Sequence, residues 1–287
     1  RSCETRAHKI LQSFGRERCK KMAAWTDAYK KWDAFADSDD DETTINDDLV
    51  VTPHAPRETP ATAADVFLRG PVLDAVQRSR VYGDGKAFVD MPLKVAPGQA
   101  LSAFRSVYVG DKDELRRFIE AHFGTEGSDL MRAPLPKDYQ QKFPQRVDAD
   151  HVELMAAIHA MWPKLLRVSR DDFPERRTLI ARRFPFVVPG GRFREGYYWD
   201  SYWIVKGLLR SGMRETALGI VRNFLDDVRA FGYVPNGNRT YYAGRSQPPL
   251  LAEMVSLLDD DALTAEAAPL IEIELSWWSG RRASAVK

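Results

Sequence analysis

Between Arg214 and Phe231 the apolar residues recur every three or four positions, and this spacing constrains the fold more than any other feature of the sequence. A period near 3.6 residues places such side chains on one face of an α-helix, and that face must be buried. Gly232 follows directly and suits the end of a helix, because glycine adopts a left-handed backbone without steric cost. The segment is therefore predicted to be a long amphipathic helix, with the charged Arg222 and Arg229 off its buried face.

Helical spacing recurs along the chain, whereas the alternation typical of β-strands is scarce. This balance favours an all-α architecture in which long loops carry the function. Further helices are predicted to begin near residues 65 and 72, to surround Leu115 and Phe118, and to cover residues 152–166, 204–209, 250–258 and 262–278. The helix over 152–166 is expected to end near Trp162 and Pro163, and three aspartates at 259–261 suit a helix start.

Residues 1–61 form a segment that cannot be assigned to a folded unit. A strongly acidic run over residues 37–48 cannot bury itself and is interpreted as a solvated linker. Proline and threonine are frequent over residues 51–64, and the helical spacing begins directly afterwards. Folded structure is thus expected to start near residue 62, with residues 62–287 forming one domain.

Composition excludes several classes of function. Lysine and arginine number 42 against 41 acidic residues, so the net charge of +1 provides no field that would gather nucleic acid. No apolar run approaches the roughly eighteen residues that a membrane-spanning helix needs. Cys3 and Cys19 are not spaced as metal ligands, and neither are the five histidines, so no metal site is predicted. None of these features assigns a cellular compartment.

Residues 189–203 combine aromatic side chains with four charged ones just before a predicted helix. Sugars present hydroxyl groups that pair with guanidinium and carboxylate groups, and C–H faces that pack on aromatic rings. This mixture therefore suits sugar recognition. The alternative is that the tyrosines and tryptophans pack at the helix entry, with Arg194 and Glu195 forming a surface ion pair worth under ~1 kcal/mol.

Residues 232–249 form a second unusual segment, rich in turn-forming residues and in amide and guanidinium donors. Its simplest interpretation is a long surface loop. However, loops beyond about 12 residues in compact domains are usually functional or disordered. The tyrosines and valine of this loop argue against disorder.

These two segments carry a family resemblance. Residues 189–202 resemble the trehalase signature PGGRFxExYxWDxY at every fixed position, and residues 236–249 resemble the NGxRxYYxxRSQPP loop of the same family. Residues 70–94 and 162–189 are also similar to that family. The resemblance extends over residues 62–287.

The resemblance implies an (α/α)₆ barrel, a toroid of six helical hairpins that binds sugar at one mouth. It also implies hydrolysis of α,α-trehalose to two glucose molecules with inversion, without a cofactor. The disaccharide is then the expected partner. Carried over by matching residue type, the implied sugar-binding positions are Arg192, Trp199, Asp200, Asn236, Arg245, Ser246 and Gln247.

The chain departs from the family pattern in one large respect. Trehalases carry their catalytic acid in an ESGWD-type segment, a second QWDxPxGW signature, and a catalytic base near the C-terminus, and none of these occurs here. We therefore expect a truncated barrel without a catalytic residue, inactive by itself, arising from an incomplete gene model. Asp200 is expected to bind substrate and Glu195 to form a structural pair. A truncated barrel would also expose helix faces that the missing hairpins cover.

Two other functions remain open at this point: a non-catalytic trehalose-binding or regulatory protein, and an inverting hydrolase for another glucoside. A sequon begins at Asn238, where Thr240 completes the glycosylation triplet. Because a glycan there would obstruct the proposed sugar loop, Asn238 is predicted to be unmodified.

Overall fold

A computed structural model describes residues 61–140, 143, 148–170 and 172–285 of the chain. The acidic run at 37–48 and nearly all of the segment 1–61 lie outside the described residues, so the linker interpretation stays a prediction. The described part is mostly helical, with one small sheet. Its helices include none that is both long and apolar enough to cross a membrane.

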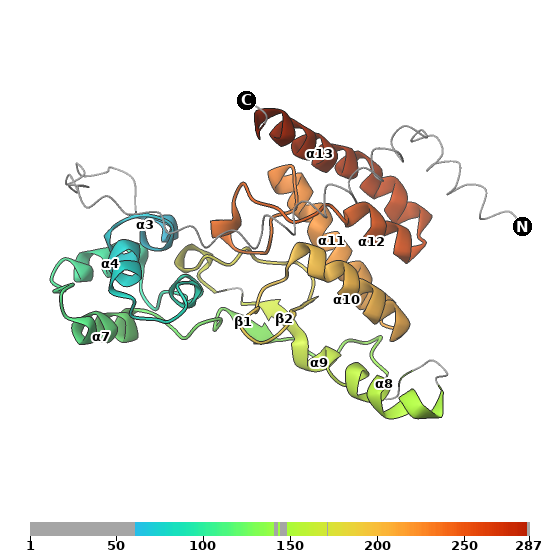
Figure 1. Ribbon diagram of the computed structural model, residues 1–287, viewed down its shortest axis with the longest axis horizontal. Helices are drawn as coiled ribbons and strands as arrows, with labels where there is room; N and C mark the ends of the chain where they lie inside the picture. The colour runs from blue at the N-terminus through green and yellow to red at the C-terminus, as the bar shows by residue number, and fades with distance from the viewer. Residues whose placement is uncertain (1–60, 141–142, 144–147, 171, 286–287) are drawn as a thin grey trace, which may run out of the picture. The chain divides into compact units, whose positions relative to one another are not determined.

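The first group of helices packs around a cluster of phenylalanines. Phe67, Phe88 and Phe123 lie with their ring centroids 5.1 to 5.7 Å apart, and Phe118 contacts the same cluster. Asp111 begins one helix by accepting hydrogen bonds from the backbone N–H groups of the first turn. The helices of this group are α3 (Ala63–Phe67), α4 (Pro71–Ser79), α5 (Lys86–Val89), α6 (Pro97–Phe104) and α7 (Lys112–His122) (Figure 1).

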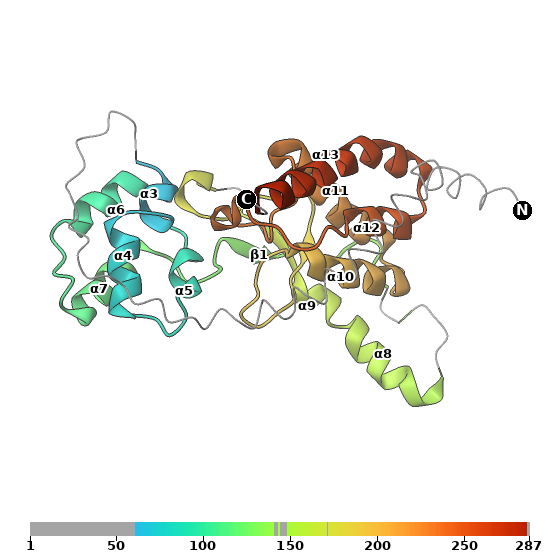
Figure 2. The same cartoon turned by 45° about the horizontal axis from the view of Figure 1, so that its top comes forward.

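The second group of helices is built around α11 (Arg214–Phe231), whose bounds match the predicted helix. Gly232 ends it with φ of 79°, as the sequence pattern indicated. α11 packs against α10 (Tyr198–Arg210), α12 (Leu251–Leu258) and α13 (Asp261–Ala285), and the four lie side by side in Figures 1 and 2. Asp260 marks the start of α13 by accepting a hydrogen bond from the backbone of Leu263 at 2.9 Å.

The predicted helix over 152–166 is divided in the structure. α8 (Val152–His159) ends before α9 (Trp162–Leu165), and Leu166 already belongs to a strand. Pro163 explains the division, because proline has no backbone N–H and is accommodated only in the first turn of a helix.

A three-stranded antiparallel sheet is the feature that sequence alternation did not predict. Its order is β1 (Leu130–Arg132), β2 (Leu166–Ser169), β3 (Phe186–Val187), with Leu130 opposite Ser169 and Leu166 opposite Val187. Strands of two to four residues are too short to show a period of two. Short 3-10 helices occupy Ala149–His151, Pro174–Arg176 and Thr240–Tyr242.

Candidate functional site

The two motif segments meet at the start of α10. The backbone N–H of Tyr198 donates to the carbonyl of Asn236 at 3.1 Å, and the N–H of Asn236 donates to the carbonyl of Arg245 at 3.0 Å. Tyr197 and Gly237 also form an isolated antiparallel bridge. Loops that are separate in the sequence are therefore joined by main-chain hydrogen bonds.

Gln247 connects the second loop to two residues of the first motif. Its side-chain oxygen accepts a hydrogen bond from the backbone N–H of Trp199 at 3.1 Å. Burial raises the pKa of Asp200 above its ordinary value, and the backbone of Asp200 and the side chain of Gln247 only partly offset this. The influence on Asp200 therefore comes from neutral groups rather than from a cation.

The remaining predicted sugar-binding residues differ in their surroundings. Arg192 is exposed, with its guanidinium 3.2 Å from the Asp84 carboxylate, and Arg245 is also exposed. Ser246 is buried, and its hydroxyl donates to the carbonyl of Val234 at 2.6 Å. The structure therefore brings Trp199, Asp200, Asn236, Arg245 and Gln247 together, whereas Arg192 contacts Asp84 and Ser246 faces inward.

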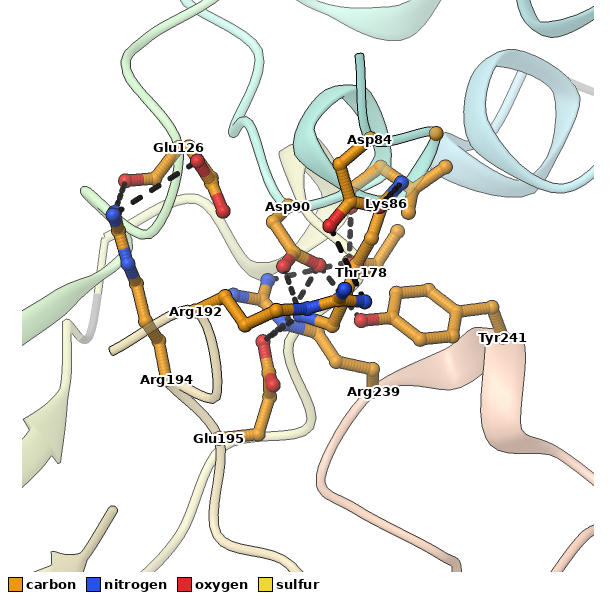
Figure 3. A network of polar contacts seen from close by, with 12 residues as sticks. Asp84, Lys86, Asp90, Glu126, Thr178, Arg192, Arg194, Glu195, Arg239 and Tyr241 are labelled. Carbon is orange, nitrogen blue, oxygen red and sulfur yellow. Dashed lines mark hydrogen bonds and ion pairs between the residues drawn. The ribbon is translucent and has the colours of Figure 1, made fainter. Parts of the chain in front are cut away.

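A buried group of charged residues lies beside these loops, and no pattern in the sequence predicted it. We call Lys86, Asp90, Asp129, Glu195 and Arg239 the ionic cluster. Arg239 has no exposed side-chain area and binds both oxygens of Asp129, while its Nε lies 3.3 Å from Glu195. Figure 3 shows Arg239 and Glu195 converging with Lys86 and Asp90 from separate segments.

Two tyrosines complete the hydrogen bonding of this cluster. Tyr241 donates its hydroxyl proton to Asp90 at 2.7 Å, and Tyr197 donates to Glu195 at 2.6 Å. Lys86 lies 2.8 Å from Glu195 and also contacts Asp90. Cations and hydroxyl groups already bind the carboxylates of Asp90 and Glu195. These carboxylates therefore hold the packed segments together and are not free to bind a ligand. Among the described residues, no group of three histidine, cysteine or acidic side chains is placed to hold a metal ion.

The pKa values of two acidic residues of the cluster, Asp90 and Glu195, shift in opposite directions. Burial raises the pKa of Asp90 to about 6, although Arg239 and Lys86 act in the opposite direction. Burial also raises the pKa of Glu195, but Arg239 and Lys86 more than offset it, so the net shift is downward. Glu195 is therefore the firmly ionised partner of the two cations.

The alternative interpretation of Arg194 and Glu195 as a surface ion pair is wrong. Glu195 is fully buried in the ionic cluster, whereas Arg194 is exposed and donates to the carbonyl of Glu126 at 2.9 Å. Figure 3 shows the two side chains directed away from each other, Arg194 toward Glu126 and Glu195 into the ionic cluster. The helix-entry packing alternative holds for the buried Tyr197 but not for Trp203, which is 60% exposed.

A signal for part of the cluster was present in the sequence. Glu195 and Arg239 occupy fixed positions of the two motifs, and an ionisable residue fixed in each motif could have been proposed as a pair. Asp90 lies within residues 70–94, which are similar to the family, but no local pattern marks Asp90 or Asp129 as a partner of Arg239. Only the folded chain identifies them as partners.

Comparisons with known proteins agree with the motifs. A family model described as Trehalase matches residues 80–287. The chain is 38% identical over 242 residues to the trehalase of Homo sapiens, covering 79% of this chain and 41% of that protein. It is 39% identical to the trehalase of Oryctolagus cuniculus (79% and 42% covered) and 35% identical to the periplasmic trehalase of Xanthomonas campestris pv. campestris (strain 8004) (78% and 37% covered). The chain thus spans about two fifths of the length of these curated relatives.

Proposed function

Because the chain belongs to the trehalase family, we propose that it takes part in the hydrolysis of α,α-trehalose to two glucose molecules. Its own contribution is a sugar-binding surface at the start of α10. The observation that carries this proposal is the position of Gln247, which contacts Trp199 and Asp200 of the first motif from within the second.

The roles of the sugar-binding residues follow from their chemistry. The Asp200 carboxylate and the amide groups of Asn236 and Gln247 would form hydrogen bonds with ring hydroxyls, and Trp199 would supply ring surface or an indole N–H. Exposed guanidinium groups of Arg192 and Arg245 would close over the sugar from the solvent side. Ser246 would act by holding the loop through its bond to Val234.

For the architecture we propose the (α/α)₆ barrel of the family, of which residues 62–287 form the N-terminal portion. Two helical hairpins support this proposal. α10 ends at Arg210 and α11 begins at Arg214, and α12 is followed by α13 after a similarly short turn. Contacts between α10 and α11 and between α12 and α13 agree with hairpin packing.

For the mechanism we propose inversion with an acid and a base supplied by sequence outside these 287 residues. Inverting chemistry needs two carboxyl groups about 6.5–9.5 Å apart, with room for a water molecule between them. Asp90, Asp129 and Glu195 are unsuited to this task, because cations occupy them in the buried cluster. The chain by itself would then bind trehalose without cleaving it.

Glucose release tests this proposal. The 287-residue chain is assayed with trehalose beside a version extended through the coding sequence that follows Lys287, and beside the extended Asp200→Asn variant. We expect activity in the extended protein alone, and a loss of about a hundredfold in the variant, comparable to removing one or two charged hydrogen bonds. Glucose release by the 287-residue chain would overturn the proposal that the catalytic acid and base lie outside these residues.

A non-catalytic trehalose-binding or regulatory protein is the alternative outcome of the same experiment. It would be indicated by trehalose binding to both versions, measured by calorimetry, with glucose release from neither. A hydrolase for another glucoside would be revealed by faster cleavage of a different disaccharide in a substrate panel.

A further inference from the structure

A cavity of about 280 Å³ opens beside the first motif, at the edge of the small sheet. Its apolar lining residues are Leu130, Leu165 and Val188, and the glycines Gly127, Gly190 and Gly191 also line it. All three glycines have positive φ values, of 72°, 106° and 61°. This part of the lining therefore follows a backbone path that residues with side chains adopt rarely.

Two arginines, Arg167 and Arg194, line this cavity, and a third lies next to it. The antiparallel register places Arg132 directly opposite Arg167, on neighbouring strands β1 and β2. Like charges directly opposite each other destabilise a sheet. Three arginine side chains thus lie close together, and the pairing of Arg132 with Arg167 across the strands is electrostatically unfavourable.

The positive charge of this group is only partly balanced by protein. Among the described residues, no carboxylate forms an ion pair with Arg132 or Arg167, and Arg194 has Glu126 at 3.9 Å. Desolvation lowers the pKa of Arg167 below its ordinary value, and the charges of Arg132 and Arg194 lower it further. The exposed Arg132 and Arg194 therefore repel the partly buried Arg167.

Backbone carbonyls fix the positions of these arginines. Nη1 of Arg167 donates to the carbonyls of Lys164 and Leu166 at 2.7 and 3.0 Å, and Nε of Arg132 donates to the carbonyl of Pro163 at 3.3 Å. Within the described part of the chain, no hydrogen bond uses Nε or Nη2 of Arg167. A guanidinium group has five N–H donors, so each arginine is held by some of them while others remain for a ligand.

We propose that this cavity binds a phosphoryl group, held between Arg167 and Arg194 with Arg132 contributing charge. Phosphate suits the site because the guanidinium fork matches its geometry, and because its charge at pH 7 of about −1.5 to −2 offsets more than one cation. Figure 3 shows Arg194 turned toward Glu126 and away from the ionic cluster, so binding would not disturb that cluster. The proposal goes beyond trehalose hydrolysis, which involves no anionic substrate.

Two ligands distinguish the sources of the phosphoryl group. Binding of inorganic phosphate and of glucose 6-phosphate to the 287-residue chain is measured by calorimetry, against sodium chloride at the same ionic strength. Tighter binding of the sugar phosphate would assign the apolar wall of the cavity to the sugar, and equal binding would assign the site to the phosphoryl group alone. Absence of binding by both ligands would overturn the proposal.

Substitutions test whether the arginines form the site. We expect Arg167→Gln and Arg194→Gln each to weaken phosphate binding about tenfold or more, the effect of losing a charged hydrogen-bond donor. Arg105→Gln, at an exposed arginine beyond the end of α6, is the matched control and should leave binding unchanged. Equal binding by all three variants would show that the phosphate lies elsewhere.

The melting temperature of Arg132→Gln, with and without phosphate, distinguishes a role in phosphate binding from a purely structural one. Without phosphate, the variant should melt at a higher temperature than the parent chain, because the repulsion across the strands is relieved. With phosphate, the gain in melting temperature should be smaller in the variant. A variant that melts lower in both conditions would mean that Arg132 stabilises the sheet by itself, contrary to the proposal.

Discussion

Arg239 holds the carboxylate of Asp129 through two hydrogen bonds, although the two residues are 110 positions apart in the chain. Both side chains are almost completely removed from solvent. Asp129 directly precedes β1, and Arg239 belongs to the second motif. The pair, with Lys86 and Glu195, thus ties the first group of helices to both sugar-binding loops.

Arg239→Gln should destabilise the chain severely. The substitution leaves Asp129 buried without its cation, a loss that typically costs about 3–5 kcal/mol of the free energy of unfolding. Urea unfolding followed by tryptophan fluorescence measures it. Arg229→Gln is the control, because Arg229 pairs with Glu266 and Asp226 at an exposed position, where loss costs under about 1 kcal/mol. Similar losses in the two variants would contradict the role of the ionic cluster.

Glu274→Gln should change how stability depends on pH. Burial raises the pKa of Glu274 to about 7 from an ordinary value of 4.5, the Tyr198 side chain and the backbone of Val234 act in the opposite direction, and the charge of Asp227 raises it further. A raised pKa means that the folded state holds the proton more tightly. Its contribution to stability is therefore present below about pH 4.5 and is lost as the pH rises to about 7.

Glutamine does not ionise, so Glu274→Gln removes the loss of stability that accompanies the rise in pH. We expect the free energy of unfolding of Glu274→Gln, relative to the parent chain, to improve by on the order of 3 kcal/mol between pH 4.5 and pH 8. Urea titrations at a series of pH values measure the difference. Glu272→Gln, two residues earlier on the same helix and exposed, is the matched control for removing one carboxylate from this helix. A pH-independent difference for Glu274→Gln would refute the assignment.

Arg192→Gln should separate sugar binding from stability. The Arg192 side chain is 61% exposed and its pairing with Asp84 is at the surface, so the free energy of unfolding should change by less than about 1 kcal/mol. If Arg192 binds a sugar hydroxyl, trehalose affinity measured by calorimetry should fall about tenfold. The exposed Arg183→Gln serves as the control and should affect neither quantity. Unchanged affinity for Arg192→Gln would remove this residue from the proposed site.

Asn238 should carry no glycan when the chain is produced in a glycosylating host. The side chain is fully buried, accepts a hydrogen bond from the N–H of Gly196 at 2.8 Å, and donates to the carbonyl of Ile180 at 3.2 Å. Mass spectrometry of the peptide containing Asn238 tests this, with Thr240→Ala as a control that destroys the sequon and should not change the mass beyond the substitution itself. A glycan on Asn238 would mean that the loop is open when the chain is modified.

The same asparagine should matter for stability. Asn238→Ala leaves the N–H of Gly196 and the carbonyl of Ile180 without their partner in a buried position. We expect a loss of roughly 2 kcal/mol or more in the free energy of unfolding, measured by urea titration. A loss below about 0.5 kcal/mol would show that water replaces the amide at no cost.

The sequence by itself determined the family, the mostly helical class and the position of α11, because these depend on motifs and on apolar spacing within one segment. Helix ends could also be predicted where a local residue decides them, as at Gly232 and Asp260. The helix break near Pro163 also depends on a local residue, but the sequence predicted its position only approximately.

Tertiary structure alone decided which side chains meet. Glu195 is adjacent to Arg194 in sequence, yet its partners are Lys86 and Arg239, 109 and 44 positions away. Arg132 and Arg167 face each other only because β1 and β2 pair in one register. Such contacts depend on how distant segments pack, and no local period in the chain encodes that packing.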